Sequence, residues 1–71
     1  MQITLKALRI NKRETQEETA RGIKVSTDTW SNYENGKTFP DVPVIQRIEK
    51  HFNIKYDDIN FLTDNYEKTV K

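Results

Sequence analysis

The stretch over residues 15–37 constrains the fold most, because it holds two helix start signals and one strong stop signal. Thr15 is a favourable N-cap residue, and Glu18 three positions later completes the capping-box pattern. Ser26 is a second N-cap residue. Asn35-Gly36 ends the second helix, since both residues tolerate the left-handed backbone conformation. The stretch therefore predicts two short helices joined by a tight turn.

Each of these helices has a recognisable inward face. Ala20 and Ile23 lie three positions apart and face the core, and Lys24-Val25 forms the turn. In the helix from Ser26 to about Glu34, three residues at i, i+1 and i+4 are predicted to face inward, namely Thr29, Trp30 and Tyr33. Four polar residues are then left on the outward face: Thr27, Asp28, Ser31 and Asn32.

The remaining chain also has a helical pattern. We predict a first helix over about residues 4–13, and a fourth helix that begins at Asp41 with an inward stripe of Val44, Ile45, Ile48 and Phe52. Residues 55–61 are predicted to form a short last helix, and no strand pattern is visible. The expected fold is an all-α, compact five-helix domain over residues 1–62, followed by a polar C-terminal tail over residues 63–71.

Composition excludes several classes of protein. The 71 residues contain no cysteine and one histidine, His51, so disulfides, zinc-cysteine sites and multi-histidine metal sites are not expected. No apolar run reaches the ~20 residues of a membrane span, and the N-terminus lacks an apolar signal core. We therefore expect a cytoplasmic protein without a membrane segment. No catalytic constellation or glycine-rich phosphate loop is present, so we expect neither an enzyme nor a cofactor.

The charge distribution weakly favours a polyanionic partner. The net charge is only +1, but residues 1–13 carry four bases and no acid. Residues 1–40 hold seven bases and five acids, whereas residues 41–71 hold five bases and six acids. The positive bias thus lies in the half that contains the two short helices, although ordinary solvated surface would account for it equally well.

Several motifs together are specific enough to indicate a family. They are Leu8-Arg9, Thr15-Gln16-Glu17-Glu18 with Ala20, Val25-Ser26, and Trp30-Ser31-Asn32-Tyr33-Glu34-Asn35-Gly36-Lys37. At this spacing the chain resembles the phage-repressor (Cro/repressor-like, XRE-type) helix-turn-helix DNA-binding family, and the resemblance covers residues 5–62. It implies a sequence-specific, double-stranded DNA-binding transcriptional regulator whose recognition helix over about residues 26–34 enters the major groove. Repression is the expected mode of regulation.

The resemblance implies a role for individual residues. The outward positions Thr27, Asp28, Ser31 and Asn32 would contact bases: asparagine suits adenine, threonine the thymine methyl group, and aspartate the cytosine amino group. For Asp28 the alternative is a first-turn acid that stabilises the helix dipole. Contacts with DNA phosphates would come from Gln16, Lys12, Arg13, Asn35, Lys37 and Thr38. Arg9 and Glu34 would form a partly buried structural ion pair between the first and third helices.

The chain departs from the family pattern at three kinds of position. The usual turn glycine is Lys24, which would cost roughly 1 kcal/mol in the left-handed conformation. Arg13-Glu14 replaces the usual Gly-Leu before the second helix. Trp30 stands where the family has Ile or Val, and Thr19 stands where it prefers Leu. The large Trp30 beside the smaller Thr19 suggests an exchange of side-chain volume in the core.

The expected partner is double-stranded DNA, bound as a homodimer that is weak in the absence of DNA, since one domain reads few base pairs. Two alternatives use the same fold. One is an antitoxin-type module that binds both DNA and a protein partner. The other is a domain that makes only protein contacts, and Gln16, Asn32 and Lys37 argue against it.

Overall fold

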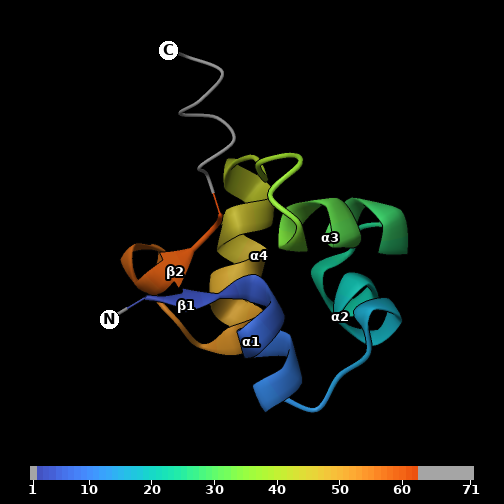
Figure 1. The fold of residues 1–71 in the computed structure, drawn as a ribbon, viewed down its shortest axis with the longest axis horizontal. Coiled ribbons are helices and arrows are strands. Elements are labelled where there is room, and N and C mark those ends of the chain that lie inside the picture. Colours follow the sequence, from blue (N-terminus) through green and yellow to red (C-terminus); the bar gives the residue numbers. More distant parts are fainter. Residues whose placement is uncertain (1, 63–71) are drawn as a thin grey trace.

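The computed structural model describes residues 2–62, and the expected tail over residues 63–71 lies outside this range. Four α-helices pack around one core, with a small strand pair at one side (Figure 1). In chain order the elements are β1 (Ile3–Thr4), α1 (Leu5–Asn11), α2 (Gln16–Ile23), α3 (Thr27–Glu34), α4 (Val42–Phe52), the 3-10 helix η1 (Tyr56–Asp58) and β2 (Ile59–Asn60).

Side-chain caps set the starts of the four helices, as predicted. Thr4 Oγ1 accepts a hydrogen bond from Ala7 N at 3.1 Å at the start of α1, and Asp41 Oδ1 accepts one from Val44 N at 3.2 Å at the start of α4. These bonds satisfy backbone N–H groups that have no partner within the helix. A proline in the first turn of α4, Pro43, is tolerated because its missing N–H would be unpaired there anyway.

The expected fifth helix over residues 55–61 is wrong. The chain forms one 3-10 turn at Tyr56–Asp58 and then the extended strand β2, which pairs in parallel with β1. Ile3 pairs with Ile59, and Thr4 with Asn60. Each strand has only two residues, too few for an alternating pattern to be visible in the sequence. The strand pair joins the two ends of the described chain, beside α1 and α4 (Figure 1).

The core is formed by apolar side chains from every helix and from β2. The buried hydrophobic residues are Leu5, Ala20, Ile23, Trp30, Tyr33, Val44, Ile48, Ile59 and Phe61. The predicted inward stripe of α4 is confirmed for Val44 and Ile48, whereas Ile45 and Phe52 are only half-buried. Trp30 is fully buried, with its ring 6.2 Å from that of Phe52, so it fills the centre of the domain.

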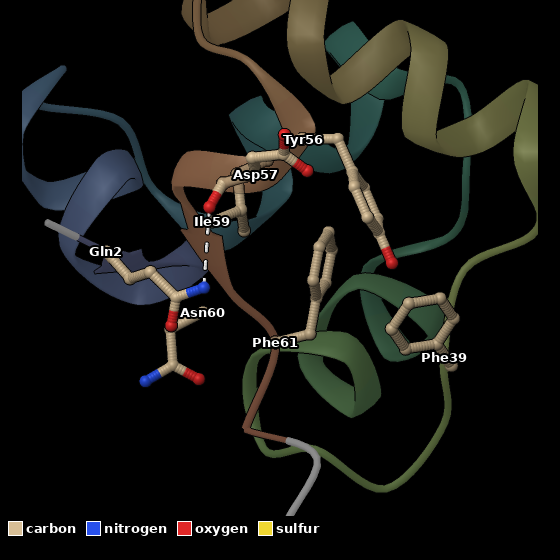
Figure 2. Close-up of a pocket in the computed structure, with 7 residues that line it drawn as sticks. All are labelled: Gln2, Phe39, Tyr56, Asp57, Ile59, Asn60 and Phe61. Atoms are coloured by element: carbon tan, nitrogen blue, oxygen red, sulfur yellow. Dashed lines mark hydrogen bonds between the residues drawn. The ribbon is translucent and has the colours of Figure 1, made fainter.

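An aromatic cluster supports the loop that follows α3. The Phe61 ring lies 4.9 Å from that of Phe39 and 5.5 Å from that of Tyr56, and Figure 2 shows the three rings side by side. On the same side, Gln2 Nε2 donates to the Asp57 carbonyl oxygen at 3.4 Å. The Phe39–Phe61 contact holds the segment between α3 and α4 against the residue that follows β2, whereas the Gln2 bond ties the N-terminal end to η1.

The described residues contain no helix long and apolar enough to cross a membrane. Within residues 2–62 there is also no group of three or more His, Cys, Asp or Glu side chains placed to hold a metal ion.

Candidate nucleic-acid interface

The helix pair α2–α3 starts with the two caps that the sequence predicted. Thr15 Oγ1 accepts from Glu18 N at 3.1 Å, and Glu18 Oε1 accepts from Thr15 N at 2.8 Å, so the capping box is complete. Ser26 Oγ accepts from Thr29 N at 3.1 Å at the start of α3. Between the helices, Lys24 has φ +69° and ψ +43°, which confirms the left-handed turn residue.

The end of α3 requires glycine. Gly36 has φ +72°, and a Cβ at this position would lie 2.5 Å from the Leu62 carbonyl oxygen. The chain therefore reverses direction at Gly36, and Lys37 N donates to the Asn32 carbonyl oxygen at 2.9 Å. This closure exposes Lys37 and Thr38 directly after the helix.

The outward face of α3 carries the predicted polar residues. Thr27 and Asp28 are exposed, and Ser31 and Asn32 are half-buried. Asn35, also exposed, donates from Nδ2 to Ser31 Oγ at 3.4 Å. The structure thus places the four predicted base-contacting residues on one short helix of eight residues.

Arg9 and Glu34 lie at the centre of a buried polar network. Arg9 Nε donates to Glu34 Oε2 at 2.6 Å, and the Glu34 side chain is 2% exposed. The same carboxylate accepts hydrogen bonds from Gln16 Nε2 at 3.1 Å and from the Trp30 indole Nε1. Arg9 Nη1 also donates to the Glu14 carbonyl oxygen at 2.9 Å. The network joins α1, the start of α2 and the end of α3, which fixes how α3 is presented.

Gln16, the predicted phosphate contact at the start of α2, takes part in this buried network. It is half-buried, and one of its two amide N–H groups is directed to Glu34. The other N–H remains available, because a glutamine amide has two donors. The network therefore orients the Gln16 side chain at the N-terminus of α2.

Lys12 and Arg13 are not brought onto the face formed by α3. Lys12 Nζ donates to the His51 carbonyl oxygen at 3.0 Å and lies 3.9 Å from Glu14 Oε2, so it contacts the end of α4. Arg13 is exposed and has φ +61°, because the chain turns there from α1 towards α2.

The profile of the helix-turn-helix domain family matches residues 3–58. The chain belongs to this family. The assignment agrees with the Cro/repressor-like resemblance and supports DNA binding, and domains of this kind are in general binding modules rather than enzymes. Neither the curated proteins nor the solved structures give a significant match to the chain.

The exposed charges near α2 and α3 of this helix-turn-helix domain are nearly balanced. Arg21 pairs with Glu17 at 3.3 Å, and both side chains are 73% exposed. Lys24 and Lys37 are exposed cations, whereas Asp28 is an exposed carboxylate on α3 itself. Strong non-specific binding to DNA depends on contacts between basic side chains and phosphates. This surface has few unpaired basic side chains and is therefore not built for strong non-specific binding.

Sequence reasoning missed a second polar cluster, centred on Glu14. His51 Nε2 lies 2.8 Å from Glu14 Oε1, and Thr19 Oγ1 donates to the same oxygen at 2.7 Å. Burial alone would raise the pKa of Glu14, but hydrogen bonds from His51 and Thr19 and the charge of Lys12 outweigh it and lower the pKa. The sequence signal that could have indicated this cluster is the presence of Arg13-Glu14 where the family usually has Gly-Leu.

Proposed function

We propose that the protein is a sequence-specific transcriptional regulator, acting as a repressor, which inserts α3 into the major groove of double-stranded DNA. The observation that carries this proposal is the arrangement of Thr27, Asp28, Ser31 and Asn32 on the accessible face of α3. The protein, bound to its operator, would block access of the transcription machinery to that DNA by occupancy.

Base recognition would come from short side chains with distinct chemistry. Asn32 would form two hydrogen bonds with an adenine, and Thr27 would contact a thymine methyl group. Asp28 would accept a hydrogen bond from a cytosine amino group and would repel nearby phosphates, so it narrows the choice of operator. Contacts with bases would therefore supply a larger share of the binding free energy than they do in a strongly basic domain.

Phosphate contacts would come from the start of α2 and from the residues that follow α3. Gln16 would use its remaining amide N–H together with the N-terminal backbone of α2. Lys37, Thr38 and Asn35 would contact the backbone beyond the C-terminal end of α3. Lys12 and Arg13 would contribute a longer-range attraction, since neither lies on α3.

We further propose that the bound form is a homodimer that assembles weakly without DNA. An open apolar hollow of about 590 Å³ lies where the loop after α3 meets α4. Its lining includes Phe39, Val42, Ile45 and Tyr56, and Val42 is 65% exposed. A two-fold axis through this surface would bury the same side chains from both copies and would place two α3 helices on one face of the dimer.

Selection of bound sites from a random duplex library tests the proposal directly. The expected result is a two-fold symmetric motif whose half-sites are about one helical turn apart, ~34–36 Å. Enrichment of no motif at low salt would contradict sequence-specific binding. A single unpaired half-site would contradict the homodimer but not the use of α3.

A further inference from the structure

A concentration of positive charge lies outside the outward face of α3, where the C-terminal ends of α2 and α4 meet. An open hollow of about 300 Å³ is lined by Gly22, Lys24, Arg47, Lys50 and His51. Its volume is some ten times the ~30 Å³ that a water molecule occupies in the liquid. No carboxylate belongs to this lining, so every ionisable side chain that lines the hollow in the described part of the chain is basic.

Three of these cations have no acidic partner in the described structure. The ion pairs among residues 2–62 involve Arg9, Lys12, Arg21 and His51, and none involves Lys24, Arg47 or Lys50. Arg47 Nε donates to the Ile23 carbonyl oxygen at 2.7 Å. This bond fixes the guanidinium at the last turn of α2, beside Lys24, and leaves the other N–H groups of Arg47 for a ligand.

Gly22 and His51 shape the floor of the hollow. A Cβ at position 22 would lie 2.5 Å from Cε1 and 2.9 Å from Nδ1 of His51, so only glycine lets the imidazole ring approach α2 this closely. The ring is held from its other side, because Nε2 lies 2.8 Å from Glu14 Oε1. Glu14 is not part of the lining and also contacts Lys12. Gly22 and His51 therefore form a fixed part of the lining of the hollow.

Helix dipoles do not account for this amount of charge. The C-terminal ends of α2 and α4 each carry a partial charge of about −0.5, which together attract roughly one cation. Lys24, Arg47 and Lys50 supply three. Lys24 also keeps a strained left-handed conformation at a position where glycine would be strain-free, which suggests that its side chain has a use.

We propose that this hollow binds a phosphate-type oxyanion, through the ammonium groups of Lys24 and Lys50 and the free N–H groups of Arg47. Guanidinium and ammonium donors around one small concave site suit the tetrahedral, multiply charged oxygens of phosphate. Such a group comes from one of two sources, the sugar-phosphate backbone of bound DNA or a free phosphorylated small molecule. The site lies outside the helix-turn-helix recognition surface, and its existence does not depend on the operator contacts proposed above.

The test is an NMR titration of the full chain, labelled with ¹⁵N, with inorganic phosphate at constant ionic strength. Saturable shifts are expected for the amides of residues 22–24 and 47–51. The double variant Lys24→Gly/Lys50→Gln should bind phosphate about tenfold more weakly, since it lacks two charge-assisted donors. Glycine at position 24 also relieves the strained backbone, so this variant is expected to fold.

The matched control is Lys6→Gln/Lys55→Gln, which removes the same charge at two exposed positions outside the hollow. Its phosphate affinity should equal that of the unmodified chain. Shifts that do not saturate, or equal affinities in both double variants, would overturn the proposal, because the anion would then respond only to net charge.

A second titration, with non-specific duplex DNA over a range of salt concentrations, distinguishes the two sources. If the anion is a DNA phosphate, the Lys24/Lys50 variant should lower the salt slope by about 2, whereas the control leaves it unchanged. An unchanged slope combined with weaker phosphate binding assigns the site to a free phosphorylated ligand. Both of these results support the site, since each requires specific phosphate binding in the first titration.

Discussion

At the scale of single residues, the backbone requires positive φ at two positions where the sequence has long basic side chains. Arg13 has φ +61° and Lys24 has φ +69°. Both occupy places where the family resemblance leads one to expect glycine. The strain at Lys24 was predicted through the family resemblance, because the family usually has glycine at this turn position.

Replacing Lys24 by glycine should stabilise the domain by about 1 kcal/mol, because glycine enters the left-handed region without a Cβ clash. Chemical denaturation would measure the change. Lys24→Ala is the control, since it removes the same side chain but retains the Cβ and should give no comparable gain. A loss of stability in Lys24→Gly would show that the lysine side chain makes contacts worth more than the strain.

The two kinds of DNA contact should separate by their dependence on sequence and salt. Asn32→Ala should lose about 1–3 kcal/mol of discrimination at one base pair. Lys37→Ala should weaken binding to all sequences alike and lower the salt slope by about 1. Binding titrations on the selected operator and on single-base variants measure both effects. Equal losses on every sequence for Asn32→Ala would refute a base-reading role for this residue.

At the scale of the elements, one carboxylate organises the contact between three helices. Glu34 accepts hydrogen bonds from Arg9, Gln16 and Trp30, which come from α1, α2 and α3. Its side chain is almost completely buried, so each donor compensates part of the cost of removing the charge from water. The network therefore couples the stability of the domain to the orientation of α3.

Arg9→Met should destabilise the domain by about 3–5 kcal/mol, because it leaves the buried Glu34 charge without its cationic partner. A domain of this size has a net stability of only a few kcal/mol, so thermal melting should show a largely unfolded variant. The matched control is Arg21→Met, which removes an exposed i,i+4 pair on α2 and should cost about 0.3–0.5 kcal/mol. Equal costs for the two variants would contradict the central role of the Glu34 network.

The cluster around Glu14 should make the domain sensitive to acid. The pKa of Glu14 is lowered from its ordinary value of 4.5 in the folded state, so the stability it contributes is present above pH 4.5. That stability is lost as the pH falls through the lower pKa of the folded protein. Denaturant titrations at several pH values should show a flatter acid limb for Glu14→Gln. An identical pH dependence of stability in both proteins would show that Glu14 does not contribute to the loss of stability in acid.

At the scale of the whole molecule, the two faces of the domain differ in chemistry. The α3 face presents small polar side chains, whereas the surface around the start of α4 presents Val42, Ile45 and the Phe39 and Tyr56 rings. The Phe39 and Tyr56 rings of this surface both contact Phe61, as Figure 2 shows, which ties the loop after α3 to the residue that follows β2. Association through this surface would therefore be linked mechanically to the end of α3.

Val42→Glu should abolish paired occupancy of the two half-sites while leaving affinity for one isolated half-site intact. A carboxylate in the first turn of α4 is compatible with the helix dipole, so the fold should be retained, but it places two like charges in the proposed dimer contact. Gel-shift titrations on full and half operators would show the loss of cooperativity. Unchanged cooperativity in the variant would place the dimer contact elsewhere on the domain.

Local signals in the sequence were enough to determine the four α-helices and the presence of a helix-turn-helix. The N-caps Thr15 and Ser26, the Asn35-Gly36 stop and the periodicity of α4 each act within a few residues. The outward residues of α3 followed from the same periodicity, since a helix has only one face left after Trp30 and Tyr33 are buried.

The tertiary structure decided everything that depends on segments far apart in the chain. The pairing of Ile3–Thr4 with Ile59–Asn60 replaced the expected fifth helix, because two-residue strands are stabilised only by each other and by the core. The hydrogen bond from Gln16 to Glu34, and the convergence of Lys24, Arg47 and Lys50 on one hollow, likewise depend on how α2, α3 and α4 pack. Local propensity defines the helices of this protein, and side-chain packing between them defines which polar groups meet.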